Sequence, residues 1–137
     1  MSRKLISKKT SNLNEKLLFH GTRSANPEEI YKDVDVAFDS RFSRAGMWGK
    51  ATYFAMNASY SKGYAYNLGN GTLCMFLAKV VLGEIIQLPS NGNLIRPPNK
   101  PNSKELYDSV QGNTGGSDVF MVYDQMRAYP LYLITFR

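Results

Sequence analysis

Residues 72–83, TLCMFLAKVVLG, carry the strongest strand signal in the chain. The run is mostly apolar, includes β-branched residues and ends at Gly83, a pattern typical of a buried strand. Lys79 interrupts the apolar residues, and no run in the sequence approaches the length needed to span a bilayer. We therefore expect a soluble, strand-rich domain with no membrane segment.

Shorter segments predict the remaining elements. A helix is expected from Asn26, a suitable N-cap, with Pro27 at the first helical position. A second helix is expected to begin at Asn57. The runs that predict further strands are KLLFH (16–20), ATYFAM (51–56), ELYDSVQ (105–111), DVFMVYD (118–124) and LYLITF (131–136), and those that predict loops or turns are 38–50, 89–102 and 113–117. Many strands with two short helices predict an α+β fold of two packed, mainly antiparallel β-sheets with short flanking helices.

Length and charge limit the organisation of the chain. Its 137 residues suffice for one domain, which we expect to cover 14–137. Residues 1–13 are basic and lack periodicity, and they predict a flexible tail. The formal net charge of +6 favours polyanionic ligands, which include dinucleotides, nucleic acids and acidic protein segments.

The chain contains one cysteine, Cys74, and one histidine, His20. A single cysteine excludes an intramolecular disulfide, and the two residues are too few for a usual zinc site, so we expect no metal. This cysteine usage favours a reducing location inside the cell, in the cytoplasm or the nucleus.

His20 stands in LLFHGT (17–22), between an apolar run and a glycine. A lone histidine there is more often a partly buried, hydrogen-bonded side chain than a functional one. If the first strand and ATYFAM are neighbours, however, His20, Gly21 and several tyrosines line one cleft. Aromatic faces, a bare glycine backbone and a hydroxyl suit a flat ring that carries an amide beside a sugar. Spacing alone favours the packing interpretation.

The order of four segments in the sequence favours the functional interpretation of His20. LLFHGT, GMWGKATYFAMNASYS, FLAKVVLGE and VFMVYDQMRAYPLYLITF occur in this sequence with spacings that together resemble the catalytic domain of the poly(ADP-ribose) polymerase family, the diphtheria-toxin-like ADP-ribosyltransferases. The resemblance covers about residues 14–137 and is closest to the macrodomain-associated mono-ADP-ribosyltransferases and the tankyrases. It implies the ADP-ribosyltransferase fold, with NAD+ consumed as co-substrate, nicotinamide released and no metal.

The resemblance assigns roles to the first motif. His20 would hydrogen-bond a ribose hydroxyl of NAD+. Gly21 would offer its backbone to the nicotinamide amide, and Thr22 would contact the adenosine ribose. The segment 39–48 matches the loop that closes over the donor site.

The second motif supplies the aromatic residues. Tyr53 matches the motif tyrosine, and Ser61 matches the hydroxyl that contacts the nicotinamide amide. A second stacking tyrosine is Tyr64 by tankyrase spacing or Tyr66 by macrodomain-type spacing, and we favour Tyr64.

The third motif position is occupied by Val119, where the polymerases have a catalytic glutamate. Valine neither accepts a proton nor orients a hydroxyl. The resemblance therefore implies transfer of a single ADP-ribose unit, to an acceptor expected to be an acidic protein side chain, by a chain expected to be a monomer.

Two alternatives remain open. One is a catalytically weak module that binds NAD+ or ADP-ribose. Two departures from the family favour this alternative. Ala51 stands where the family usually has glycine, and basic residues stand where the family has a further strand ahead of the first motif. The other is an ADP-ribosyltransferase whose acceptor is RNA or DNA, which the positive charge permits.

Overall fold

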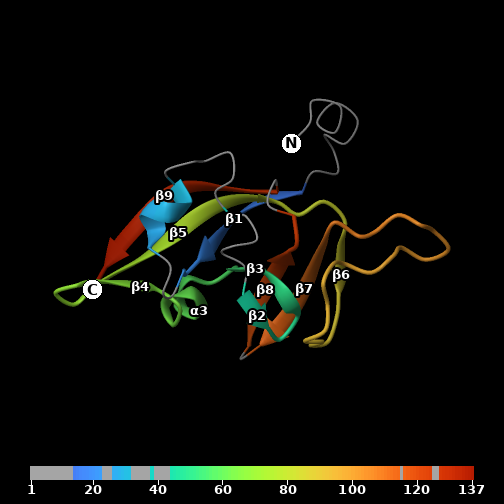
Figure 1. The fold of residues 1–137 in the computed structure, drawn as a ribbon, viewed down its shortest axis with the longest axis horizontal. Coiled ribbons are helices and arrows are strands. Elements are labelled where there is room, and N and C mark those ends of the chain that lie inside the picture. Colours follow the sequence, from blue (N-terminus) through green and yellow to red (C-terminus); the bar gives the residue numbers. More distant parts are fainter. Residues whose placement is uncertain (1–13, 23–25, 32–37, 39–43, 115, 125–126) are drawn as a thin grey trace.

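The apolar run that dominates the sequence forms β5 (Thr72–Val81), a long strand within a mainly antiparallel sheet (Figure 1). The computed structural model describes residues 14–22, 26–31, 38, 44–114, 116–124 and 127–137. Its other strands are β1 (Glu15–His20), β2 (Arg44–Gly46), β3 (Gly49–Ala55), β4 (Tyr66–Gly69), β6 (Ile85–Gln87), β7 (Ser109–Thr114), β8 (Ser117–Val122) and β9 (Ala128–Phe136). The helices are α2 (Pro27–Tyr31) and α3 (Ala58–Lys62).

Hydrogen bonding connects the strands in the order β4-β5-β1-β3-β8-β7-β6, with β9 paired to β5 and β2 paired to β3. The pairings are antiparallel except for β6 with β7, which are parallel. The strands fall into two groups, which Figure 1 shows on opposite sides of the view: β4, β5, β9 and β1, and then β2, β3, β8, β7 and β6. These groups meet where β1 lies beside β3, and the register of that pairing is Phe19 opposite Ala55. The structure is thus α+β, as expected.

Two apolar clusters lie on opposite faces of β3 and β8, because successive side chains of a strand point to opposite faces. The first cluster contains Phe54, Phe120 and residues of β1 and β5, so it joins the two strand groups. The second contains Tyr53, Val119 and Trp48. Ala51 belongs to the second cluster and is 1% exposed, so the apolar interior accommodates its methyl group.

Several predicted elements are confirmed. Strands form over 16–20, within 51–56 and over most of 72–83. The first helix begins at Pro27, and the Glu28 N–H donates to Asn26 Oδ1 at 3.0 Å, the hydrogen bond expected of an N-cap. The second helix begins directly after Asn57.

The boundaries of other predicted elements were wrong. The expected loop at 38–50 contains β2 and the start of β3, since a turn with Gly49 at φ +84° folds Arg44–Gly46 back onto β3. The strand expected at 105–111 instead begins at Ser109 and extends to Thr114, into the expected turn. β4 and β6 were missed, because both are short and carry a weak periodic pattern, and β4 is also largely exposed.

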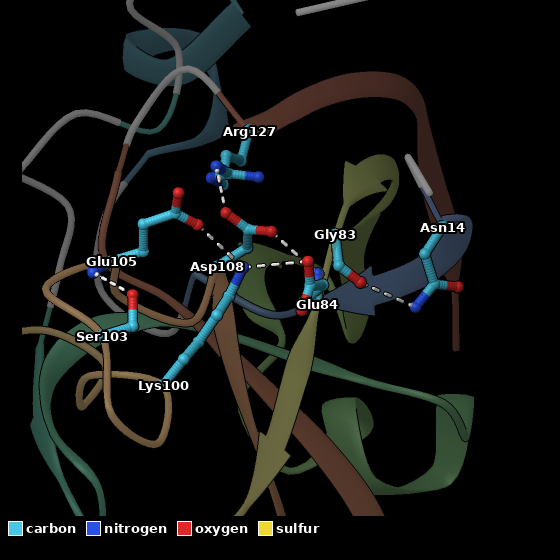
Figure 2. A network of polar contacts seen from close by, with 8 residues as sticks. All are labelled: Asn14, Gly83, Glu84, Lys100, Ser103, Glu105, Asp108 and Arg127. Atoms are coloured by element: carbon cyan, nitrogen blue, oxygen red, sulfur yellow. Dashed lines mark hydrogen bonds and ion pairs between the residues drawn. The ribbon is translucent and has the colours of Figure 1, made fainter. Parts of the chain in front are cut away.

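A polar network holds the segment before β7 against the end of β5 (Figure 2). Asp108 accepts hydrogen bonds from the Glu84 backbone N–H at 2.8 Å and from the Arg127 guanidinium at 2.8 Å. Lys100 forms ion pairs with Glu84 at 2.9 Å and Glu105 at 3.4 Å. The network therefore secures a segment that has almost no regular secondary structure.

Both described helices are five residues long. Within the described ranges, none is long and apolar enough to cross a membrane.

Candidate functional site

The pairing of β1 with β3 brings His20 to Tyr53. His20 Nδ1 lies 2.7 Å from the Tyr53 carbonyl oxygen. A carbonyl only accepts hydrogen bonds, so Nδ1 carries the proton, and in the neutral ring Nε2 then has the lone pair. A ribose hydroxyl can donate to a nitrogen in this state.

Aromatic rings hold His20 in place. Its side chain is 5% exposed, and its ring centroid lies 5.2 Å from those of Phe38 and Phe54. These contacts orient the imidazole, and they are also the contacts of a packed histidine. The functional interpretation therefore rests on the residues gathered around it.

A cavity of about 190 Å³ lies beside β3 and α3. Its aromatic walls include Tyr53 from β3 and Tyr60 and Tyr64 from the α3 region. The Tyr60 and Tyr64 rings lie 5.4 Å apart between centroids, tilted by 41°. The remaining lining comes from Ala45, Gly46, Met47 and Trp48. Several aromatic rings around a small space suit a flat heterocycle. We call this space the aromatic cavity.

Gly21 is placed where only glycine fits. A Cβ atom there would overlap the Tyr64 carbonyl oxygen and come within 2.7 Å of the Ser61 carbonyl oxygen. The backbone of Gly21 is thus pressed against the segment that carries Ser61 and Tyr64. Ser61 is 3% exposed, and its carbonyl accepts the Tyr64 N–H at 2.9 Å.

The Tyr53 side chain is fixed through its hydroxyl. The hydroxyl donates to the Gly49 carbonyl oxygen at 2.7 Å and accepts the Trp48 backbone N–H at 2.9 Å. The ring is 6% exposed and packs over Gly46, where a Cβ would lie 2.6 Å from the Tyr53 hydroxyl oxygen. The turn between β2 and β3 therefore sets the position of this ring.

Not all of the predicted residues meet at the aromatic cavity. Tyr64 lines it, whereas Tyr66 begins β4, opposite Cys74 of β5, and does not contribute to the lining. Thr22 follows Gly21, is partly buried and is likewise outside the lining. His20, Gly21 and Ser61 do not line the cavity either, so the expected cleft shared by His20, Gly21 and the tyrosines is formed only by tyrosines among these residues. Of the loop predicted at 39–48, positions 39–43 lie outside the described residues, and the rest forms β2 and the turn to β3.

Val119 lies on the same face of the sheet as Tyr53. It pairs with Ala55 of β3 and with Gly112 of β7, and its side chain is fully buried in the second apolar cluster. The adjacent carboxylate, Asp118, accepts a hydrogen bond from Asn113 Nδ2 at 3.0 Å and is not part of the aromatic cavity.

Sequence reasoning missed Trp48, Tyr60 and Tyr123. Tyr123 donates its hydroxyl to the Trp48 carbonyl oxygen at 2.6 Å, and burial raises the pKa of its phenol far above the ordinary value. One sequence feature could have identified Trp48, because it is the only tryptophan in the chain. Its segment was predicted to be a loop, so its burial in the interior was not expected.

A second, larger cavity of about 550 Å³ shares Met47 and Trp48 with the aromatic cavity. Its lining is richer in amide and hydroxyl groups and comes from Met47, Trp48, Gln87, Leu88, Pro89, Ser90, Gln111, Gly112, Asn113 and Asp118. We call it the amide-lined cavity.

Among the described residues, no group of three or more histidine, cysteine, aspartate or glutamate side chains is arranged to hold a metal ion. The site is made of aromatic rings, one imidazole, hydroxyls and backbone amides, a donor set suited to an organic ligand.

Comparison with known sequences agrees with this geometry. A family model described as the poly(ADP-ribose) polymerase catalytic domain matches residues 3–116. The human protein mono-ADP-ribosyltransferase PARP14 is 36% identical over 137 residues, which covers 96% of this chain. A probable poly(ADP-ribose) polymerase of Dictyostelium discoideum is 37% identical over 144 residues and 99% of the chain. Mouse protein mono-ADP-ribosyltransferase PARP11 is 34% identical over 146 residues and 90% of the chain.

The chain corresponds to less than half of each of these relatives. The aligned part is 7% of PARP14, 39% of the Dictyostelium protein and 43% of mouse PARP11.

Proposed function

This chain belongs to the poly(ADP-ribose) polymerase catalytic domain family, and from that premise we propose that it transfers one ADP-ribose unit from NAD+ to an acceptor and releases nicotinamide. The observation that carries the proposal is the aromatic cavity, which Tyr53 and Tyr64 both line, together with the close packing of the Gly21 backbone against Tyr64.

Nicotinamide occupies the aromatic cavity in this proposal. Tyr53 and Tyr64 stack on the ring, and the choice of Tyr64 over Tyr66 is supported by the lining. The backbone of Gly21 and the hydroxyl of Ser61 hydrogen-bond the carboxamide. The steric requirement at Gly21 supports a close approach of backbone in this region.

The sugars of NAD+ lie along the end of β1. Nε2 of His20 accepts a ribose hydroxyl, and the bond from Nδ1 to the Tyr53 carbonyl keeps the ring in the required tautomer. Thr22, two residues further, contacts the adenosine ribose.

The reaction breaks the bond between the nicotinamide nitrogen and C1″ of the ribose, and the bonding electron pair leaves with nicotinamide. Positive charge develops on the ribose, as in glycoside cleavage. An acceptor carboxylate then forms the new bond to C1″. The residues described hold NAD+ in a dry site and orient it, and the nucleophile belongs to the acceptor. The names of the relatives from human and mouse, protein mono-ADP-ribosyltransferases, support a protein acceptor.

Val119 explains why one unit is transferred. Chain growth needs a group that orients a hydroxyl of the first ADP-ribose toward the next donor. The Val119 side chain offers only methyl groups and is buried among apolar neighbours, where a hydrated hydroxyl is disfavoured.

The proposal also includes the ADP-ribosyltransferase fold. The two strand groups act as the two packed sheets of the ADP-ribosyltransferase fold, supported by the apolar cluster that they share. Residues 14–137 form the single catalytic domain.

The test is incubation with isotopically labelled NAD+, followed by mass spectrometry of the protein and of added RNA. We expect release of nicotinamide and mass increments of isolated ADP-ribose units on protein. Polymer ladders would contradict the role given to Val119. Labelled RNA with unlabelled protein would favour a nucleic-acid acceptor, and binding without nicotinamide release would favour a module that binds NAD+ without turnover.

A further inference from the structure

Trp48 lies between the two cavities and lines both of them. It is the only tryptophan in the chain and is 2% exposed. The indole is therefore an interior wall shared by the aromatic cavity and the amide-lined cavity.

Three hydrogen bonds attach Trp48 to three different parts of the fold. Its backbone N–H donates to the Tyr53 hydroxyl at 2.9 Å, and its carbonyl accepts the Tyr123 hydroxyl at 2.6 Å. Its indole Nε1–H donates to the Leu88 carbonyl oxygen at 3.0 Å. One residue thus contacts the aromatic cavity, the end of β8 and the segment that follows β6.

The segment after β6 also forms hydrogen bonds with residues that precede and follow Trp48 in the sequence. The Asn91 N–H donates to the Met47 carbonyl oxygen at 2.7 Å, and the Lys50 N–H donates to the Leu94 carbonyl oxygen at 3.3 Å. A displacement of residues 88–94 therefore pulls on the same turn that positions the Tyr53 hydroxyl.

Gly112 of β7 packs directly against the indole. A Cβ at this position would overlap the Cζ2, Cε2 and Cη2 atoms of Trp48. The indole fills the space that a side chain would take, so a substitution at Gly112 displaces Trp48 although Gly112 itself does not line the aromatic cavity.

We infer that Trp48 is a positioning residue, which couples the segment 88–94 and the amide-lined cavity to the Tyr53 ring in the aromatic cavity. This inference rests on the proposed function, because it takes the aromatic cavity as the site of nicotinamide. A tryptophan that only fills space would affect stability, whereas one that transmits position also changes affinity for the donor.

Gly112→Ala is the direct test, and Gly92→Ala is its matched control. Gly92 lies in the coupled segment, where an added Cβ meets its nearest atom, the Gly46 carbonyl oxygen, at an ordinary 3.7 Å. The fluorescence of the single tryptophan reports the position of the indole, and titration with NAD+ gives the dissociation constant. Thermal unfolding verifies that each variant is folded.

We expect Gly112→Ala to shift the tryptophan emission and to weaken NAD+ binding about tenfold or more, because the displaced indole moves the Tyr53 ring that stacks on nicotinamide. Gly92→Ala should change neither. A shifted emission with unchanged NAD+ affinity overturns the coupling and leaves the proposed function intact. If the unaltered protein fails to bind NAD+, the proposed function and this inference fail together.

Trp48→Phe supplies a second measurement in case Gly112→Ala does not fold. Phenylalanine retains an aromatic ring and the backbone N–H to Tyr53, and it lacks the indole N–H that binds the Leu88 carbonyl. We expect a higher KM for NAD+ with a smaller change in kcat. Equal KM values in the variant and the unaltered protein would overturn the coupling.

Discussion

His20 Nδ1 is bound to a backbone carbonyl on the strand that carries Tyr53, and this geometry separates two roles of the imidazole. Nδ1 binds within the protein, and Nε2 is assigned to NAD+. Replacement by asparagine retains a donor near Nδ1 and removes Nε2, and replacement by alanine removes both.

We expect both His20→Asn and His20→Ala to lose roughly 10²-fold or more in turnover, because a positioned polar group matters most in the transition state. His20→Asn should retain more stability than His20→Ala, since it keeps a donor for the Tyr53 carbonyl. Nicotinamide release per folded molecule is the measurement. Full activity of folded His20→Asn would show that the histidine serves packing alone.

The two candidate tyrosines also differ at the scale of one side chain. Tyr64 lines the aromatic cavity, and Tyr66 does not. Tyr64→Ala should weaken binding of a benzamide-type ring by more than the roughly 0.5–1.5 kcal/mol assigned to stacking, because contact area is lost as well. Calorimetric titration should show this loss of affinity in Tyr64→Ala and not in Tyr66→Ala. A loss confined to Tyr66→Ala would reverse the assignment.

Single elements show where sequence reasoning succeeds and where it fails. β5 and β3 were predicted because their apolar residues are continuous and buried. β2 was missed because its three residues become a strand only by pairing with β3 across a glycine turn, a contact that local composition does not encode. Trp48 was missed for the same reason, since its partners at Leu88 and Tyr123 lie far along the chain.

The segment that leads into β7 depends on Asp108 rather than on regular structure. Asp108→Ala removes the acceptor for both Glu84 N–H and Arg127, and we expect a loss of about 1–3 kcal/mol in the free energy of unfolding. Glu105→Ala is the control, because its side chain is 74% exposed and a solvent-exposed ion pair contributes little to stability. Urea denaturation measures both. Equal, small losses would mean that the network in Figure 2 contributes little to stability.

For the whole molecule, three groups give stability the same dependence on pH. Burial raises the pKa of the Cys74 thiol and of the Tyr123 phenol, and the hydrogen bond to Glu84 raises the pKa of Lys100. A pKa raised by folding means that the folded state binds the proton more tightly. The contribution is complete below the unfolded pKa and is lost as pH rises through the folded one.

We therefore expect the free energy of unfolding to fall progressively from about pH 9 upward, where cysteine and then tyrosine begin to ionise in the unfolded chain. Urea denaturation between pH 7 and pH 11 measures the slope. Tyr123→Phe should flatten it, and Tyr129→Phe should not, because Tyr129 is 46% exposed. A slope that is unchanged in Tyr123→Phe would exclude the buried phenol as its source.

The antiparallel pairing of β3 with β8 also sets the order in which the site can be completed during synthesis. Ala55 leaves the ribosome roughly 60 residues before its partner Val119, a delay of about 3–12 s at the usual speed of translation. Throughout that interval the apolar side chains of β3, Phe54 among them, have no β8 to cover them, and they are available to chaperones or to other nascent chains. The residues proposed to bind nicotinamide are thus translated early, yet in the nascent chain the proposed donor site is completed only after β8 has emerged.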